Sequence, residues 1–286
     1  MLRRRCVCLC SALVLTLPAL LGAQGAQGAQ QPTVTESAAV RGCLEEGGIT
    51  GPHTGTILLH DLQRNSWVAG RAERVDRALL PASTFKVFSS LALLEAGVLA
   101  TKLSVIPWDS VTRDRAETNR DLTLQEAFRL SSLAHYQVGV RRLPPGFMRR
   151  FLDDVGYGNR DLSGGDDRFW IDGGLRISPR QQVAFLKRLF RSALPVSPRT
   201  TQVVKEMMAI EETPTYVLRA KTGLTTVPDP GSIGWWVGWV ERGARVTFFA
   251  TVLESATPPA DFAARRLAVT RCALERTGAL PAPAPR

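Results

Sequence analysis

Strand-like and helical stretches are unevenly distributed along this chain of 286 residues, and that distribution limits the folds open to it. Stretches rich in β-branched and aromatic residues occur near both ends, at 55–62, 65–69, 215–220, 233–241 and 245–253. The segment between them has apolar residues at helical spacing. The pattern predicts a two-domain α/β or α+β fold: an antiparallel β-sheet made from both chain ends, flanked by N- and C-terminal helices, with an inserted all-helical domain.

Local signals place the helices. A first one covers 84–96 and ends before Gly97, and others cover 122–130 and 147–155. Two more begin at Ser178-Pro179 and Ser197-Pro198, where a hydroxyl can cap the helix and proline takes its first position. A last helix covers 261–276. The predicted domains are a sheet domain at 41–78 and 200–278, a helical domain at 79–199, and a disordered tail at 279–286.

The first thirty residues have the features of a targeting segment. Arg3 to Arg5 form a positive region, and an apolar stretch then runs to a small-residue cleavage site near Ala23. We expect residues 1–23 to be a cleavable signal peptide and 24–40 a flexible leader with Gly-Ala-Gln repeats. This predicts a periplasmic protein without a membrane span in its mature form.

Composition excludes several classes of protein. Apolar residues make up 44% of the chain and charged residues 22%, which is typical of a globular protein. The net charge of +10 comes without any basic run interleaved with aromatics, so we expect no nucleic-acid partner. The histidines His53, His60 and His135 show no ligand spacing, and we predict no metal site.

Two cysteines remain outside the predicted leader, at positions 43 and 272. An exported protein favours their pairing, and a disulfide between them would join the two ends of the chain. Two unpaired, buried thiols are the alternative.

The segment Ser83-Thr84-Phe85-Lys86 stands at the predicted start of a helix. Residues at i and i+3 emerge on one face, so the Ser83 hydroxyl and the Lys86 amine would lie about a hydrogen bond apart. The partial positive charge of a helix N-terminus favours a nearby oxyanion. Since such a pair arises by chance about once in a chain of this length, an ordinary helix start with a solvated lysine is the preferred explanation of the pair taken alone.

A second motif, Lys221-Thr222-Gly223, follows the predicted strand 215–220. On a strand edge it presents a hydroxyl and accessible backbone beside a cationic amine, which suits a substrate carboxylate and carbonyl. This triplet is expected by chance in only about a few per cent of chains of this length. An exposed edge with an ordinary turn is the structural alternative.

Six motifs in order resemble those of the class D (oxacillinase) β-lactamases, which belong to the penicillin-recognising serine enzymes. They are Ser83-Thr84-Phe85-Lys86, Ser131-Ser132-Leu133, Tyr157-Gly158-Asn159, Phe169-Trp170, Lys221-Thr222-Gly223 and Gly234-Trp235-Trp236-Val237-Gly238-Trp239. The chain has no Ser-Asp-Asn triplet, which separates it from class A. The resemblance runs from about residue 55 to the end of the last helix. It implies a β-lactamase/transpeptidase-like fold and hydrolysis of the β-lactam amide of penicillins and related small molecules.

The resemblance implies an acyl-enzyme mechanism. Ser83 would attack the lactam carbonyl, and Lys86 would be the general base. A lysine can act so only as a neutral amine, and in this family such a lysine captures carbon dioxide as a carbamate, N6-carboxylysine. We therefore expect no bound cofactor but a requirement for carbon dioxide or bicarbonate, with the indole N–H of Trp170 supporting the carbamate. The apolar walls would be Phe85, Leu133, Trp170 and Ile171.

Further roles follow from the same resemblance. Ser131 would pass a proton to the leaving nitrogen, and Lys221 would polarise it. The backbone N–H groups of Ser83 and Leu224 would form the oxyanion hole. Thr222 and Gly223 would line the substrate. Arg266 would bind the substrate carboxylate, with Arg265 as the neighbour that could be confused with it.

Two positions depart from the family pattern. Leu133, a predicted substrate contact, stands where the family usually has valine, and its added methylene puts efficient deacylation in question. His135 stands where an apolar residue is usual, and we expect it to be structural.

Two other functions remain open at this stage. A penicillin-binding sensor domain or a DD-peptidase would be acylated at the same serine without turning over. A sensor domain normally follows several membrane spans, whereas here only a cleavable leader is expected. The resemblance is compatible with a monomer or a homodimer.

Overall fold

A computed structural model describes residues 31–282, so the predicted signal peptide and the first part of the leader lie outside it. Within this range, residues 33–282 belong to one compact unit. Its central sheet has the strand order β1-β3-β2-β9-β8-β7-β6. The strands are β1 (Thr35–Glu36), β2 (His53–Asp61), β3 (Ser66–Gly70), β6 (Ala209–Glu212), β7 (Val217–Thr226), β8 (Ser232–Arg242) and β9 (Arg245–Ser255).

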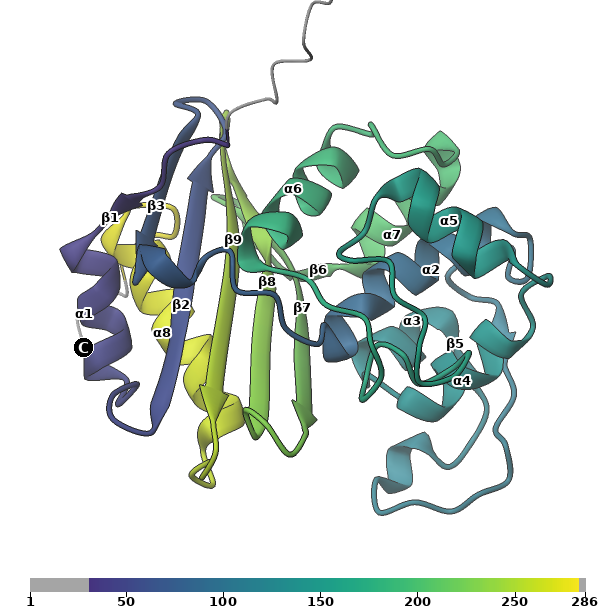
Figure 1. Ribbon diagram of the computed structural model, residues 1–286. Helices are drawn as coiled ribbons and strands as arrows, with labels where there is room; N and C mark the ends of the chain where they lie inside the picture. The colour runs from purple at the N-terminus through teal and green to yellow at the C-terminus, as the bar shows by residue number, and fades with distance from the viewer. Residues whose placement is uncertain (1–30, 283–286) are drawn as a thin grey trace, which may run out of the picture. The chain divides into compact units, whose positions relative to one another are not determined.

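Both chain ends contribute to this sheet, because β2 from the first half pairs antiparallel with β9 from the second half. The middle strands β8 and β9 are buried along almost their whole length. Helices therefore cover both faces of the sheet. The helices α1 (Ala38–Glu46) and α8 (Phe262–Arg276) pack on one face, and α6 (Pro179–Phe190) packs on the other (Figure 1).

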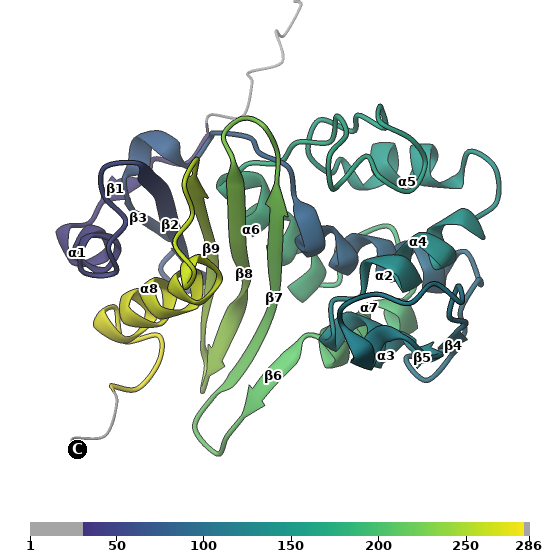
Figure 2. The same cartoon turned by 90° about the horizontal axis from the view of Figure 1, so that it is seen from below.

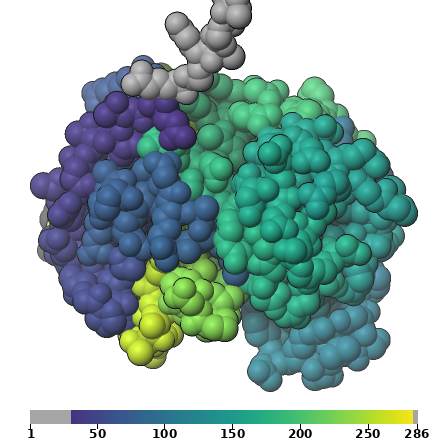
Figure 3. All heavy atoms as spheres, viewed as in Figure 1, coloured from purple at the N-terminus to yellow at the C-terminus, as the bar shows by residue number. Residues whose placement is uncertain are grey.

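The segment between β3 and β6 supplies the remaining helices. They are α2 (Phe85–Glu95), α3 (Leu124–Arg129), α4 (Leu133–Arg141), α5 (Phe147–Val155) and α7 (Pro198–Met207), with a short pair of strands, β4 (Val105–Ile106) and β5 (Leu122–Thr123). The mixed fold with an inserted helical segment is confirmed. In the space-filling view these residues, in blue-green and teal, gather on one side of the sheet strands (Figure 3). The predicted boundary at 199/200 falls inside α7, and the domain limits themselves stay a prediction.

Local signals placed several elements well. The helix α5 has the predicted bounds, and Ser178 and Ser197 are the N-caps of α6 and α7. Each cap side chain accepts a hydrogen bond from a backbone N–H in the first turn, from Gln181 and Thr200 respectively.

Three expectations differ from the structure. The sheet is not wholly antiparallel: β1 pairs parallel with β3, because the chain runs along that free edge before entering α1. The predicted leader at 24–40 is too long, since it includes β1 and the start of α1. The predicted tail at 279–286 begins too early, because Ala279 and Leu280 are buried against the face that α1 and α8 cover.

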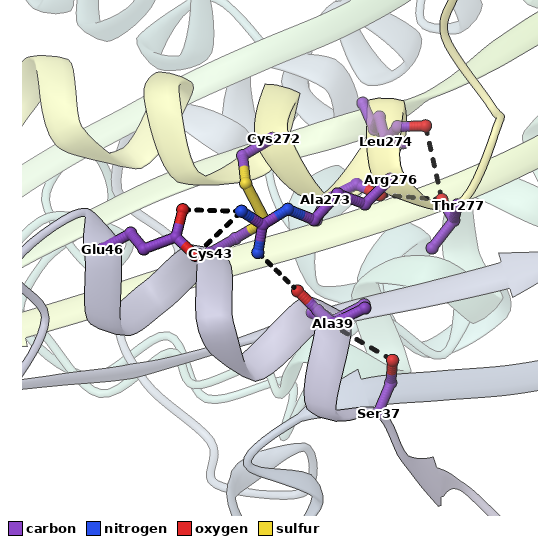
Figure 4. Close-up of a disulfide and its surroundings, with 10 residues drawn as sticks. Ser37, Ala39, Cys43, Glu46, Cys272, Ala273, Leu274, Arg276 and Thr277 are labelled. Carbon is purple, nitrogen blue, oxygen red and sulfur yellow. Dashed lines mark hydrogen bonds and ion pairs between the residues drawn. A yellow bond between two sulfur atoms is a disulfide. The ribbon is translucent and has the colours of Figure 1, made fainter. Parts of the chain in front are cut away.

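Cys43 of α1 and Cys272 of α8 form a disulfide, with their Cα atoms 5.7 Å apart. Figure 4 shows the bond between the two helices, beside the ion pair of Arg276 with Glu46. Arg276 also donates a hydrogen bond to the carbonyl oxygen of Ala39, at 3.3 Å. The two ends of the described chain are thus joined covalently and by charge.

No helix among residues 31–282 is long and apolar enough to cross a membrane.

Candidate active site

The predicted nucleophile lies in the short 3-10 helix η2 (Ala82–Thr84), which leads directly into α2. Lys86 lies in the first turn of α2, and its Nζ donates a hydrogen bond to the Ser83 hydroxyl at 2.8 Å. Ala82, before the serine, has a φ of 49°, a conformation that costs a non-glycine residue about 1 kcal/mol or more. Its N–H is held by the carbonyl of Trp170 at 3.0 Å. The surrounding structure therefore fixes where the hydroxyl points.

Lys86 is completely buried. Its Nζ lies 5.3 Å from the centre of the Tyr136 ring. Burial, and to a smaller extent the positive charge of Arg115, lowers the pKa of Lys86 from 10.5 to about 7. A substantial fraction of this amine is therefore neutral near neutral pH. Of the predicted apolar walls, Phe85 and Trp170 are buried in the main core cluster, and Leu133 and Ile171 are partly buried and pack against that cluster.

A second lysine and serine face the first pair. The Nζ of Lys221 donates hydrogen bonds to the Ser131 hydroxyl at 2.8 Å and to the Thr222 carbonyl at 3.0 Å. Burial lowers the pKa of Lys221 well below its usual value, and the nearby charges of Lys86, Arg266 and Arg115 lower it further. Ser131 has a φ of 54°, so its backbone is strained as well. Two serine–lysine pairs thus meet at one place.

The sequence predicted that Lys221-Thr222-Gly223 follows a strand. The structure instead places the motif inside β7. Only residues 217–219 of β7 pair with β6, so residues 221–226 form a free edge in the described sheet. Gly223 allows η2 to lie against this edge. A Cβ there would be 3.0 Å from the Pro81 carbonyl and 3.1 Å from the Thr84 side chain. An extended substrate can therefore lie along β7 close to Ser83.

Two further predicted residues have buried donors with no partner among residues 31–282. They are Nε1 of Trp170, whose side chain is wholly buried, and Nε and Nη1 of Arg266, which is 9% exposed. An unsatisfied buried donor is costly, which fits a donor intended for an anion. Burial also lowers the pKa of Arg266 to about 10. Arg265 is different, because it is more exposed and pairs with Asp261.

The remaining predicted positions are also placed by the structure. Thr222 is half-buried, and Leu224 is exposed on the free edge of β7. The Nε2–H of His135 donates a hydrogen bond to the Arg120 carbonyl at 2.9 Å, and its Nδ1 accepts one from the Ser132 hydroxyl at 2.8 Å. Its role in holding α4 against the preceding loop is structural. No group of three or more metal-ligating side chains occurs in the described part of the chain.

Sequence reasoning missed two neighbours of the site, Tyr136 and Arg115. Tyr136 contacts Lys86 through its ring, and its hydroxyl hydrogen-bonds to Ser90 at 2.7 Å. Arg115 lies on the loop between β4 and β5, far in sequence from either lysine. No spacing or motif in the chain marks either residue.

The fold and the two serine–lysine pairs define a class of protein. Residues 49–270 match the family model described as the penicillin binding protein transpeptidase domain. The chain is 39% identical over 227 residues to β-lactamase OXA-48 of Klebsiella pneumoniae, covering 79% of this chain and 84% of that protein. It is 37% identical over 199 residues to β-lactamase OXA-10 of Pseudomonas aeruginosa, covering 68% of this chain and 74% of that one.

Solved structures narrow the class further. The class D β-lactamase YbXI from Nostoc has a TM-score of 0.78 and 39% identity, with 84% of this chain and 98% of that chain covered. A class D β-lactamase from Sebaldella termitidis has a TM-score of 0.81 and 30% identity, with 87% and 100% covered. The chain belongs to the class D β-lactamases, within the penicillin-binding transpeptidase family.

Proposed function

We propose that this enzyme hydrolyses the β-lactam amide of penicillins and related antibiotics through an acyl-enzyme on Ser83. The observation that carries the proposal is the 2.8 Å hydrogen bond between the Ser83 hydroxyl and the buried amine of Lys86. A pKa of about 7 makes this amine available as a base near neutral pH. The similarity to named β-lactamases supports the same reaction.

In this proposal, the Ser83 oxygen bonds to the lactam carbonyl carbon as the base at Lys86 takes its proton. The C–N bond of the lactam then breaks, and Ser131 gives a proton to the nitrogen and is reprotonated, by way of Lys221, from the base at Lys86. A water molecule next gives a proton to the base at Lys86 and bonds to the acyl carbon, and the Ser83 ester bond breaks as the Ser83 oxygen takes that proton back. Backbone N–H groups of Ser83 and Leu224 stabilise the oxyanion. Arg266 binds the substrate carboxylate, which is supported by its buried Nε and Nη1, both without a hydrogen-bond partner among residues 31–282. Thr222, Gly223 and Leu133 line the substrate.

We further propose that Lys86 is modified by carbon dioxide to N6-carboxylysine. The residues fit this group: the amine is buried with a lowered pKa, and the Trp170 indole N–H has no other partner among the described residues. The anionic oxygen of this group, in place of the free amine, would then be the general base for both acylation and deacylation. Trp170 would hold that oxygen, and the apolar walls would exclude bulk water from it. Carbon dioxide or bicarbonate is then required for full activity.

The proposed site of action is the periplasm. The disulfide between Cys43 and Cys272 supports an oxidising compartment. The predicted signal peptide at 1–23 lies outside the described residues and stays a prediction.

One kinetic experiment tests the reaction and the modification together. Purified protein is given a chromogenic cephalosporin at mildly acidic pH, first in bicarbonate-free buffer and then after bicarbonate is added back. We expect steady turnover that falls several-fold without bicarbonate and recovers with it. A single stoichiometric burst under both conditions would instead indicate a sensor domain or a DD-peptidase. Steady turnover indifferent to bicarbonate would contradict the carbamate alone.

A further inference from the structure

A cavity of about 300 Å³ opens between the loop that joins β4 to β5 and the start of α4. Ser131 and Leu133 line one side of it, and Arg115 lines the other. The cavity therefore adjoins the serine–lysine pairs of the proposed active site, on the side of the inserted helices. Nothing in the mechanism above uses Arg115.

Contacts hold the Arg115 guanidinium at this place. Its Nη1 donates to the carbonyl of Leu130 at 2.8 Å, the residue directly before Ser131. Its Nε donates to the Glu117 carboxylate at 3.0 Å. Both members of the ion pair are about half exposed, at 53% and 50%, so the pair is weak and an incoming anion can share or replace it.

The charge of Arg115 reaches the centre of the site. It lowers the pKa of both Lys86 and Lys221, although burial is the larger cause for each. Other charges at the cavity are engaged elsewhere or opposite in sign: Arg113 forms a two-pronged ion pair with Asp109, and Asp114 lies on the same loop. Of the two arginines that line this cavity, Arg115 therefore has the weaker ion pair.

The chemistry of a β-lactam fixes its direction in the site. Its ring carboxylate stands beside the lactam nitrogen, and the acylamino side chain stands on the carbon beside the carbonyl, so the two leave the reacting amide on opposite sides. Arg266 comes from α8, whereas Arg115 comes from the helical segment, and α8 and the helices α3 and α4 lie on opposite sides of β7 (Figures 1 and 2). With the ring carboxylate at Arg266, the acylamino side chain would extend toward the side of β7 on which the Arg115 cavity lies.

Resting on the proposed function, we propose that Arg115 selects β-lactams whose acylamino side chain carries a second negative charge. The substrate class is the penicillins with a carboxylate on the side chain. That carboxylate would accept hydrogen bonds from the Arg115 guanidinium and displace Glu117 from it. At a partly exposed site, such charge-assisted hydrogen bonds should raise kcat/KM for the penicillin with the side-chain carboxylate about ten-fold relative to the penicillin without it.

The test compares two penicillins that differ only in this carboxylate, benzylpenicillin and α-carboxybenzylpenicillin. The measured quantity is the ratio of their kcat/KM values. We expect Arg115→Leu to lower the ratio about ten-fold. Glu117→Gln should raise it, because it frees Arg115. The matched control is Arg120→Leu, which removes an equally exposed arginine paired with Glu126 outside the cavity, and its ratio should equal that of the wild type.

The outcomes separate this inference from the function on which it rests. If Arg115→Leu and Arg120→Leu give the same ratio as the wild type while both penicillins are hydrolysed, the selection by Arg115 is wrong and the proposed function stands. If the wild type is acylated without turnover, acylation rate constants from intact-protein mass spectrometry give the same ratio. If neither penicillin acylates Ser83, both proposals fail.

Discussion

Lys86 illustrates how a single residue can lower stability in order to serve a reaction. Its amine is completely buried and has no carboxylate among the causes that shift its pKa. The unfolded chain binds a proton at this amine up to pH about 10.5, whereas the folded protein releases it from about pH 7 upward. Folding at a pH between these values therefore expels a proton, which lowers the free energy of unfolding by roughly a few kcal/mol at pH 7. The fold carries this cost in exchange for a neutral amine beside Ser83.

Replacing Lys86 by methionine should therefore stabilise the protein and stop continuous turnover. In bicarbonate-free buffer at pH 7 we expect the free energy of unfolding to rise by roughly a few kcal/mol. Because the penalty is full below the folded pKa and vanishes above the unfolded one, the gain should shrink as pH rises toward 10. Urea unfolding of both proteins at pH 7 and pH 10 measures this. A gain that grows with pH would show that the amine is not held neutral.

At the scale of elements, the site depends on how closely η2 approaches the free edge of β7. They can approach this closely because Gly223 has no side chain. A Cβ at this position would lie only 3.0–3.2 Å from atoms of Pro81 and Thr84. Ser83 stands between these two residues in the chain. The distance between the nucleophile and the substrate strand is therefore set by one glycine.

Gly223→Ala should lower kcat/KM by about ten-fold or more, because displacing a reacting group by a fraction of an ångström is enough for such a loss. Unfolding by urea should change much less than the rate does. Gly42→Ala is the control. An added Cβ at Gly42 would meet only the flexible side chains of Arg276 and Glu46, where α1 packs against α8. Equal rates for the two variants would mean that the approach of η2 to β7 does not limit the reaction.

Across the whole molecule, the features that could be predicted from the sequence are the helices, caps and site residues specified by local spacing or by a motif. Helix α5 and the caps at Ser178 and Ser197 follow from spacing and cap residues. An N-terminal helix was predicted as part of the fold, but its bounds were not, because α1 is stabilised by packing against α8, β3 and β2. Ala279 and Leu280 were assigned to the tail for a similar reason, since they are buried by the same packed face. The motif residues around Ser83 and Lys221 were found, but Arg115 was not. Its place depends on how a loop folds back over Ser131, which no local pattern encodes.

The disulfide is a contact of very long range, with a sequence separation of 229 between its two cysteines. It joins α1 to α8, and therefore the first helix to the last across one face of the sheet (Figure 4). Closing a loop of this length removes much conformational freedom from the unfolded chain, with a typical stabilisation of about 2–5 kcal/mol.

Reduction, or the double substitution Cys43→Ser with Cys272→Ser, should therefore lower the free energy of unfolding by about 2–5 kcal/mol. Activity at 25 °C should persist in either case, because neither cysteine lies near Ser83 or Lys221 and the helices α1 and α8 also pack through buried apolar side chains. Urea unfolding with and without reductant measures the change, and the double variant should not respond to reductant. A wild-type protein whose unfolding midpoint is the same in both buffers would show that the bond does not tie the two chain ends in solution.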